Sequence, residues 1–249
     1  MPASSSIETV LVRAQPRMTP MGLSEWLTDR EGLEYNRLPL RRQTHWLAGR
    51  LALKQAYRQA KGPYEFSDIE VIRDSVGRPN IVGATLQCSI AHAGGYGLGA
   101  VGRESLGADV EPARRWDEAV AHHVACAREL EFVAAAGVSE AQVPTVTWTI
   151  KEAVLKAMGT GLAVHPRRAV IAGLYGDGWL VRVVDGRVGE GTWHVVAESL
   201  GGAWVAVAYP PGAGPVRFSV WCCPRPSSVE AAQGRRVTTG NGTGWEGGE

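Results

Sequence analysis

Two segments of the sequence resemble each other at a distance of about one hundred residues, and this repeat restricts the possible folds more than any other feature. The first segment, WLAGRLALKQAYRQAKG, begins at Trp46, and the second, WTIKEAVLKAMGTG, begins at Trp148. Each helix-like segment is followed by a Gly-Gly turn between apolar strand-like runs, at Gly94–Gly95 and at Gly201–Gly202. This paired order of helix and hairpin predicts a chain built from two similar halves.

Both halves carry further strand-like runs between the helix and the Gly-Gly turn. In the first half these are IEVIRD and CSIAHA, and in the second they are AVIAGLY, WLVRVV and WHVVAES, separated by turn sequences. The pattern therefore predicts that each half is a long helix followed by an antiparallel meander, which is an α+β unit. We expect residues 1–112 to form the N-terminal half and residues 113–223 the C-terminal half. The halves should be related by a pseudo-two-fold axis, with a ligand cleft between them.

The composition argues against several classes of protein. A formal net charge of +1 gives no general attraction to nucleic acid or acidic membranes, and no apolar run is long enough to span a bilayer. The N-terminus lacks the apolar region of a signal peptide, and Cys88, Cys126, Cys222 and Cys223 show no metal-site spacing. We therefore expect a cytoplasmic protein. Residues 224–249 are rich in Gly, Ser, Thr and Pro and read as a disordered tail.

The second helix-like segment carries a polar face. Trp148, Glu152 and Lys156 fall four residues apart, on the side opposite an apolar stripe. Glu152 and Lys156 have the spacing of a solvated helix ion pair worth about 0.2–0.5 kcal/mol, and that is the simplest interpretation. When Trp46 is laid on Trp148, however, Arg50 aligns with Glu152, and Lys54 aligns with Lys156. This alignment predicts that the two helices present a basic and an acidic residue to one shared cleft.

A second polar feature is the strand-like segment GADVEP, residues 107–112. Asp109 and Glu111 alternate with apolar residues and should point to the same side of the strand. On a solvent-facing strand the pair would have no function. With Glu152 as a third carboxylate, the set would supply the hard oxygen ligands that Mg²⁺ prefers, leaving positions for water and phosphate oxygens. Lys156, one helical turn after Glu152, would then face a phosphate.

GADVEP followed by WTIKEAVLKAMGTGL resembles the signature of the 4′-phosphopantetheinyl transferases, and the resemblance is to the larger, surfactin-synthetase-activating type. Matching segments run from about residue 41 to about residue 209 and include RRQTHWLAGRLALKQAY, GRPNI, CSIAHAGG and RELEFV. The resemblance implies a monomer of two similar halves. It implies Mg²⁺-dependent transfer of the phosphopantetheine arm of coenzyme A to a serine of an acyl or peptidyl carrier protein. The residues that match the metal-binding carboxylates of the family are Asp109, Glu111 and Glu152.

The resemblance also implies roles for the residues around these carboxylates. Glu152 matches the family's candidate for the catalytic base, and Lys156 matches the lysine near the phosphates. His92 matches a histidine that contacts a phosphate of coenzyme A. Arg50 and Arg78 match basic positions that hold the nucleotide end.

The sequence departs from the family pattern beside His92. The family commonly has hydroxyl residues there, whereas this chain has Ala91 and Ala93. This difference motivates one alternative, a coenzyme A or nucleotide-binding homologue without transferase activity. Two others are a divalent-metal phosphohydrolase that uses the same carboxylates and a pure interaction protein. The sequence leaves open the carrier protein, its pathway, and whether Glu129 joins the metal site.

Overall fold

The computed structural model describes residues 6–14, 22–114, 116, 118–185 and 189–222, and it confirms the mixed α+β class. One sheet has the strand order β11-β1-β5-β4, a second has the order β6-β10-β9-β8-β7, and β2 and β3 form a separate ribbon. Within these residues, no helix has the length and apolar character needed to cross a membrane. The helices are α1 (Leu23–Trp26), α2 (Asp29–Arg37), α3 (Leu40–Lys61), α4 (Glu118–Val124), α5 (Ala127–Ala135) and α6 (Val143–Ala157), with 3-10 turns at Phe66–Asp68, Gly161–Ala163 and Pro166–Arg168. The strands are β1 (Ile7–Arg13), β2 (Val71–Arg73), β3 (Pro79–Ile81), β4 (Gln87–Ala93), β5 (Tyr96–Gly102), β6 (Gly107–Pro112), β7 (Ala169–Tyr175), β8 (Gly178–Asp185), β9 (Gly189–Leu200), β10 (Ala203–Tyr209) and β11 (Val216–Trp221).

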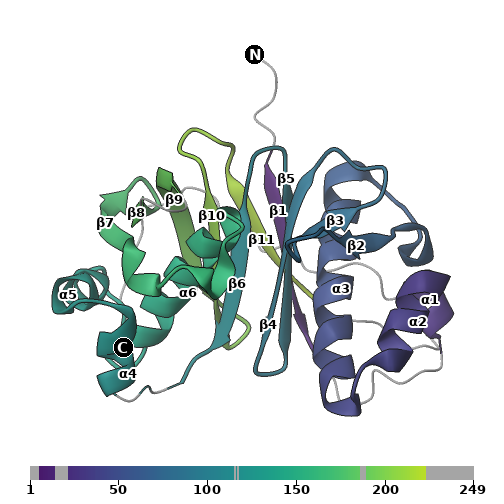
Figure 1. Cartoon of the computed structure of the whole chain (residues 1–249), viewed down its shortest axis with the longest axis horizontal. Helices are drawn as coiled ribbons and strands as arrows, with labels where there is room; N and C mark the ends of the chain where they lie inside the picture. The colour runs from purple at the N-terminus through teal and green to yellow at the C-terminus, as the bar shows by residue number, and fades with distance from the viewer. Residues whose placement is uncertain (1–5, 15–21, 115, 117, 186–188, 223–249) are drawn as a thin grey trace, which may run out of the picture.

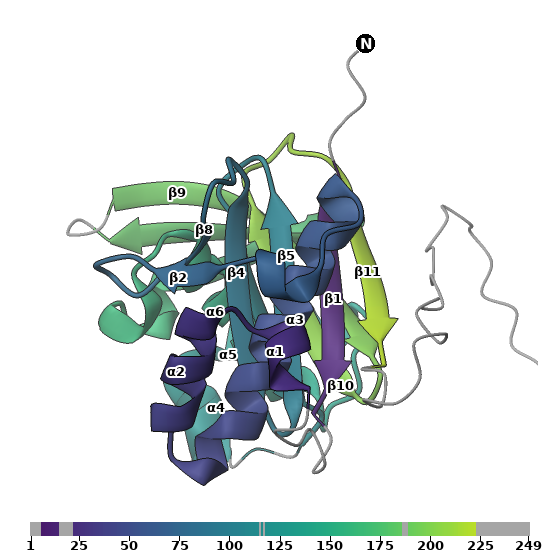
Figure 2. The ribbon, with the colours of Figure 1, turned by 90° about the vertical axis from the view of Figure 1, so that its right-hand side faces the viewer.

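The two sheets pack face to face, and one long helix covers the outer side of each (Figure 1). Figure 2 looks onto the α3 side and shows α1, α2 and α3 in front of the strands of the first sheet. Apolar side chains fill all three interfaces between these layers, as the alternation of apolar residues in the strands requires. They include Leu47, Leu51 and Val12 under α3, Leu11, Leu98 and Val205 between the sheets, and Ile150, Val154 and Val181 under α6.

Strands β6 and β11 each pair with a strand from the other side of the expected division at residue 112. β6 follows β5 in the chain but pairs with β10, whereas β11 follows β10 and pairs in parallel with β1. The expected division after residue 112 therefore does not coincide with the division between the sheets. The physical reason is that β6 is buried on both faces, with Val110 in the core between the sheets and Asp109 against α6. The expected tail, residues 224–249, lies outside the described residues.

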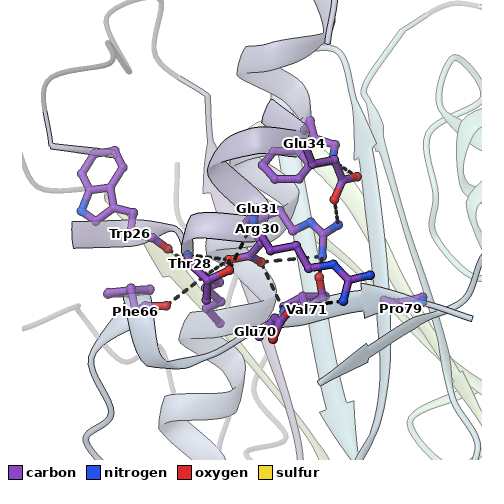
Figure 3. Close-up of polar contacts among 12 residues, drawn as sticks. Trp26, Thr28, Arg30, Glu31, Glu34, Phe66, Glu70, Val71 and Pro79 are labelled. Atoms are coloured by element: carbon purple, nitrogen blue, oxygen red, sulfur yellow. Dashed lines mark hydrogen bonds and ion pairs between the residues drawn. The ribbon is translucent and has the colours of Figure 1, made fainter. Parts of the chain in front are cut away.

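A buried lysine on α3 fixes the N-terminal part of the fold. Lys54 is fully buried, and its Nζ lies 2.5 Å from Oε2 of Glu31 and donates hydrogen bonds of 2.8 Å to the carbonyls of Trp26 and Phe66. Glu31 also accepts a hydrogen bond of 3.3 Å from the amide of Val71, at the start of β2. Figure 3 shows Glu31 among these partners. The charge of Lys54 is thus neutralised inside the core, as a buried ammonium requires.

A second buried lysine, on α6, makes matching contacts in the C-terminal part. Nζ of Lys151 lies 2.7 Å from Oε1 of Glu129 and 3.4 Å from the carbonyl of Pro166. Glu129 accepts hydrogen bonds of 2.9 Å from the amides of Cys126 and of Ile171, which is on β7. Both carboxylate oxygens of Glu129 are therefore bound by Lys151 or by backbone amides and hold the fold together. None of these contacts places Glu129 beside Asp109 or Glu111 on β6.

Gly99 on β5 lies against the backbone of α3, where a Cβ atom would overlap Leu53. We expect Gly99→Ala to lower the free energy of unfolding by about 2–3 kcal/mol, because α3 would have to move as one body. Gly32→Ala, within α2 and with open space around it, is the matched control and should raise that free energy by about 0.5–1 kcal/mol. Urea unfolding of the three proteins measures both effects, and an unchanged Gly99→Ala midpoint would contradict the close approach.

Candidate functional site

Two adjoining cavities lie between the β2–β3 ribbon, β4 and the C-terminal end of α6. The larger has a volume of about 500 Å³ and the smaller about 260 Å³. They share the side chains of Arg73, Pro79, Ile90 and Lys156, so they form one continuous recess. The larger cavity is lined by residues from both sides of position 112, and its role as a ligand cleft remains a prediction.

The carboxylates of β6 face α6 instead of solvent. Asp109 is only 5% exposed, and its Oδ1 lies 2.5 Å from Nζ of Lys156. Glu111, two residues later, accepts a hydrogen bond of 3.2 Å from the indole of Trp148 and lies 3.9 Å from Arg114. Both therefore contact α6 residues from one face of the strand. Burial raises the pKa of Asp109, and the ammonium of Lys156 opposes that rise.

Among Asp109, Glu111 and Glu152, the negative charge of Glu152 has the fewest neutralising contacts. It is 7% exposed, and its Oε1 is buried without a hydrogen-bond partner. Burial, followed by the charge of Asp109 and, more weakly, that of Glu111, raises its pKa to about 7. Lys156 forms its ion pair with Asp109, so the solvated Glu152–Lys156 pair is not what the structure contains. Glu152 and Asp109 are not among the residues that line the two cavities, whereas Lys156 is. A carboxyl whose pKa is raised toward neutrality is suited to accepting a proton near neutral pH.

The same carboxylates have the chemistry of a divalent-cation site. Asp109 Oδ2 and Glu152 Oε1 are both buried acceptors without a partner, which is costly unless a cation or water completes them. Hard oxygen donors of this kind suit Mg²⁺. Glu111, the third predicted ligand, is held by Trp148 and Arg114, and no set of three metal-type side chains is closed around one point in the described part of the chain. The two unpartnered oxygens therefore fit a cation, and Glu111 would have to exchange its partners to join them.

The predicted cationic residues differ in their availability. His92 lies on the wall of the smaller cavity with an exposed side chain, and partial desolvation by the surrounding protein lowers its pKa. Arg50 reaches the same wall but is 2% exposed, and it donates to the carbonyl of Val71 at 2.5 Å and to Glu34 at 3.1 Å. The charge of Arg50 is therefore neutralised by Glu34. Arg50 and Glu152 do not form the basic and acidic ends of one shared site, as the repeat had predicted. The guanidinium of Arg78 donates to the carbonyl of Met158, at the C-terminal end of α6, over 3.1 Å.

Sequence reasoning missed Arg73, which lines both cavities. The sequence predicts a strand in the segment IEVIRD but does not by itself indicate that this strand pairs with the GRPNI segment. In the structure Arg73 is paired with Pro79 across the β2–β3 ribbon. This hairpin pairing is the signal that would have placed Arg73 near Arg78.

Residues 105–208 match the model of the 4′-phosphopantetheinyl transferase superfamily. The holo-[acyl-carrier-protein] synthase of Geobacillus kaustophilus (strain HTA426) is 40% identical over 90 residues, which are 32% of this chain and 70% of that protein. The holo-[acyl-carrier-protein] synthase of Halalkalibacterium halodurans is 31% identical over 108 residues, 40% of this chain and 91% of that protein. Among solved structures, a holo-(acyl-carrier-protein) synthase from Bacillus anthracis str. Ames in complex with CoA (3′,5′-ADP) covers 39% of this chain and 93% of its own, with 28% identity and a TM-score of 0.37.

Proposed function

Since the chain belongs to the 4′-phosphopantetheinyl transferase superfamily, we propose that it transfers the 4′-phosphopantetheine arm of coenzyme A to a serine of an apo acyl or peptidyl carrier protein. The products are the holo-carrier and adenosine 3′,5′-bisphosphate. The observation that carries this proposal is the pair of unpartnered carboxylate oxygens, Asp109 Oδ2 and Glu152 Oε1, near Lys156, which binds Asp109 and itself lines the recess. Acidic oxygens next to a lysine are what a pyrophosphate with its metal ion requires.

In this reaction the serine oxygen forms a bond to the phosphorus that carries the pantetheine, and the bond from that phosphorus to the adenosine-side phosphate breaks. Mg²⁺, held by Asp109, Glu152 and Glu111, would neutralise pyrophosphate charge and polarise the reacting phosphorus. Glu152 accepts the serine proton, directly or through water, since a carboxyl whose pKa is raised is a stronger base than an ordinary glutamate. Lys156 stabilises charge on the phosphate oxygens, and the released bisphosphate carries the electron pair away.

We infer further that the chain is of the larger, two-half type and that a pseudo-two-fold axis relates its halves. The matching buried contacts support this. Lys54 on α3 binds a glutamate that also accepts a β2 amide, and Lys151 on α6 binds one that also accepts a β7 amide. These contacts align Lys54 with Lys151. The alignment of the two sequence segments had instead paired Lys54 with Lys156. Two fused halves of this kind would act as a monomer.

The nucleotide end of coenzyme A would occupy the recess beside His92. His92 can donate to a phosphate oxygen, and Arg78 lies at the wall of the larger cavity, where its one hydrogen bond to Met158 can be exchanged for a phosphate. Ala91 and Ala93 offer no hydroxyl donor at this point. That lack favours the second candidate function, a coenzyme A-binding homologue without transferase activity.

Mass spectrometry of several apo-carriers, incubated with the protein, coenzyme A and Mg²⁺, tests the proposal. The expected result is a gain of one phosphopantetheine group by at least one acyl or peptidyl carrier, and the ranking of carriers identifies the partner. Coenzyme A binding without any gain would instead establish the non-catalytic homologue. Release of phosphate in the absence of a carrier would identify a phosphohydrolase.

A further inference from the structure

The carboxylate of Glu111 is held on both of its oxygens. Oε1 accepts a hydrogen bond of 3.2 Å from the indole of Trp148, and Oε2 lies 3.9 Å from the guanidinium of Arg114. Asp109 and Glu152, in contrast, each keep one buried oxygen without a partner. Glu111 is thus the one predicted metal ligand whose charge is engaged by donors on both sides.

The two groups that hold Glu111 belong to one stack of side chains. The guanidinium of Arg114 lies 5.0 Å from the ring centre of Trp116, and the ring centres of Trp116 and Trp148 are 5.7 Å apart. The stack joins two elements, because Arg114 and Trp116 follow β6 in the chain whereas Trp148 is on α6. Cation–π and aromatic contacts restrict the orientation of the groups that make them. We call Arg114, Trp116 and Trp148 the Glu111 clamp.

The Glu111 clamp stabilises the ionised form of Glu111. Burial, followed by the charge of Asp109, raises the pKa of Glu111, and the charge of Arg114 and the hydrogen bond from Trp148 oppose that rise. The same contacts work against a metal ion. A divalent cation that uses an oxygen of Glu111 competes with the indole hydrogen bond, and it is repelled by the guanidinium of Arg114.

We propose that the Glu111 clamp lowers the affinity of the three carboxylates for a divalent cation, with Arg114 and Trp148 acting as positioning residues through Glu111. This inference rests on the proposed function and concerns the regulation of its metal site. A site that binds a divalent cation weakly on its own needs the oxygens of a further anion to complete it. The clamp therefore favours entry of the cation together with the pyrophosphate of coenzyme A.

Electron paramagnetic resonance of free Mn²⁺, which replaces Mg²⁺ as the probe, measures this affinity without coenzyme A or a carrier. Trp148→Phe keeps an aromatic ring against Trp116 but removes the donor, and it should bind Mn²⁺ about fivefold or more tightly than wild type. Arg114→Gln should tighten binding about two- to fivefold, and Arg114→Lys, which keeps the charge, should stay close to wild type. A purely structural role of these side chains would predict weaker binding in both variants.

Trp204→Phe is the matched control for Trp148→Phe. Trp204 on β10 lies opposite Glu111 in the strand pair, but its indole donates to Gln142 at 3.3 Å. Its replacement should therefore leave the Mn²⁺ affinity unchanged. Adding Asp109→Asn to Trp148→Phe should abolish the tighter binding, which locates the ion at the carboxylates.

The outcomes separate this inference from the proposed function. Failure of wild type and of every variant to bind Mn²⁺ contradicts the proposed metal site, and the clamp with it. Mn²⁺ binding by wild type, with unchanged or weaker binding by Trp148→Phe or Arg114→Gln, overturns the clamp alone. Tighter binding that persists after Asp109→Asn overturns it as well, because the ion would then lie elsewhere. Melting temperatures of all variants establish that each is folded.

Discussion

Asp109→Asn should reduce phosphopantetheine transfer by about a thousandfold while the protein stays folded. The substitution removes the carboxylate that binds Lys156 at 2.5 Å and that offers Oδ2 as a buried, unpartnered acceptor. An amide of the same shape brings no charge to neutralise a cation, and one of its two oxygens becomes a donor. Because burial already disfavours the ionised form of Asp109, the neutral variant should not lose stability.

The measurement is the initial rate of holo-carrier formation at saturating coenzyme A and Mg²⁺, with the melting temperature as the test of folding. Asp177→Asn is the matched control, since Asp177 has a side chain that is 79% exposed and lies outside both cavities. Its rate should equal that of wild type. Near-normal turnover of Asp109→Asn would remove Asp109 from the proposed metal site and leave its contact with Lys156 a purely structural one.

Glu152→Gln should lower the turnover number about a hundredfold or more and change the Michaelis constant for coenzyme A little. Glutamine fills the same space but cannot accept the serine proton. Steady-state kinetics with one carrier over a range of coenzyme A concentrations separates the two constants. A raised Michaelis constant with unchanged turnover would show that Glu152 contributes to binding only.

The same variant should reveal the energetic cost of Glu152 in the absence of divalent cations. A carboxyl whose pKa rises from 4.5 to about 7 on folding keeps its proton longer in the native state. Its contribution to stability is therefore greatest below pH 4.5 and is lost as the pH rises to about 7, with a slope of up to about 1.4 kcal/mol per pH unit. Melting temperatures from pH 5 to pH 8 should show this decline in wild type but not in Glu152→Gln. Equal slopes in both proteins would contradict the raised pKa.

Local patterns in the sequence were sufficient to predict the two central elements of the site. The i, i+4 spacing on α6 and the i, i+2 spacing on β6 are set by the geometry of a helix and a strand. The structure accordingly brings Trp148 to Glu111 and Lys156 to Asp109. The metal role of the three carboxylates remains a prediction, because such spacing says where side chains point and not what they bind.

The features that were not predicted depend on contacts between distant segments. The alignment of Trp46 with Trp148 paired Lys54 with Lys156, but one aromatic residue in each of two helices does not determine which turn of each helix enters the core. The turn that enters the core is determined by the buried ion pairs of Lys54 with Glu31 and of Lys151 with Glu129. Likewise, no local pattern reveals that β11 returns to β1 or that Arg50 has carboxylate partners on α2. Such pairings are decided by tertiary packing.

The parallel pairing of β1 with β11 also determines how the molecule responds to mechanical force. Ile7 is opposite Val216, and Val12 is opposite Trp221, so the chain enters the pair at one end and leaves it at the other. Tension between these two ends pulls the strands lengthwise past each other, and the hydrogen bonds of the ladder must break together instead of one after another. A protease machine that unravels the protein by pulling on the polypeptide beyond β11 would meet this shear-loaded pair before it reaches the recess.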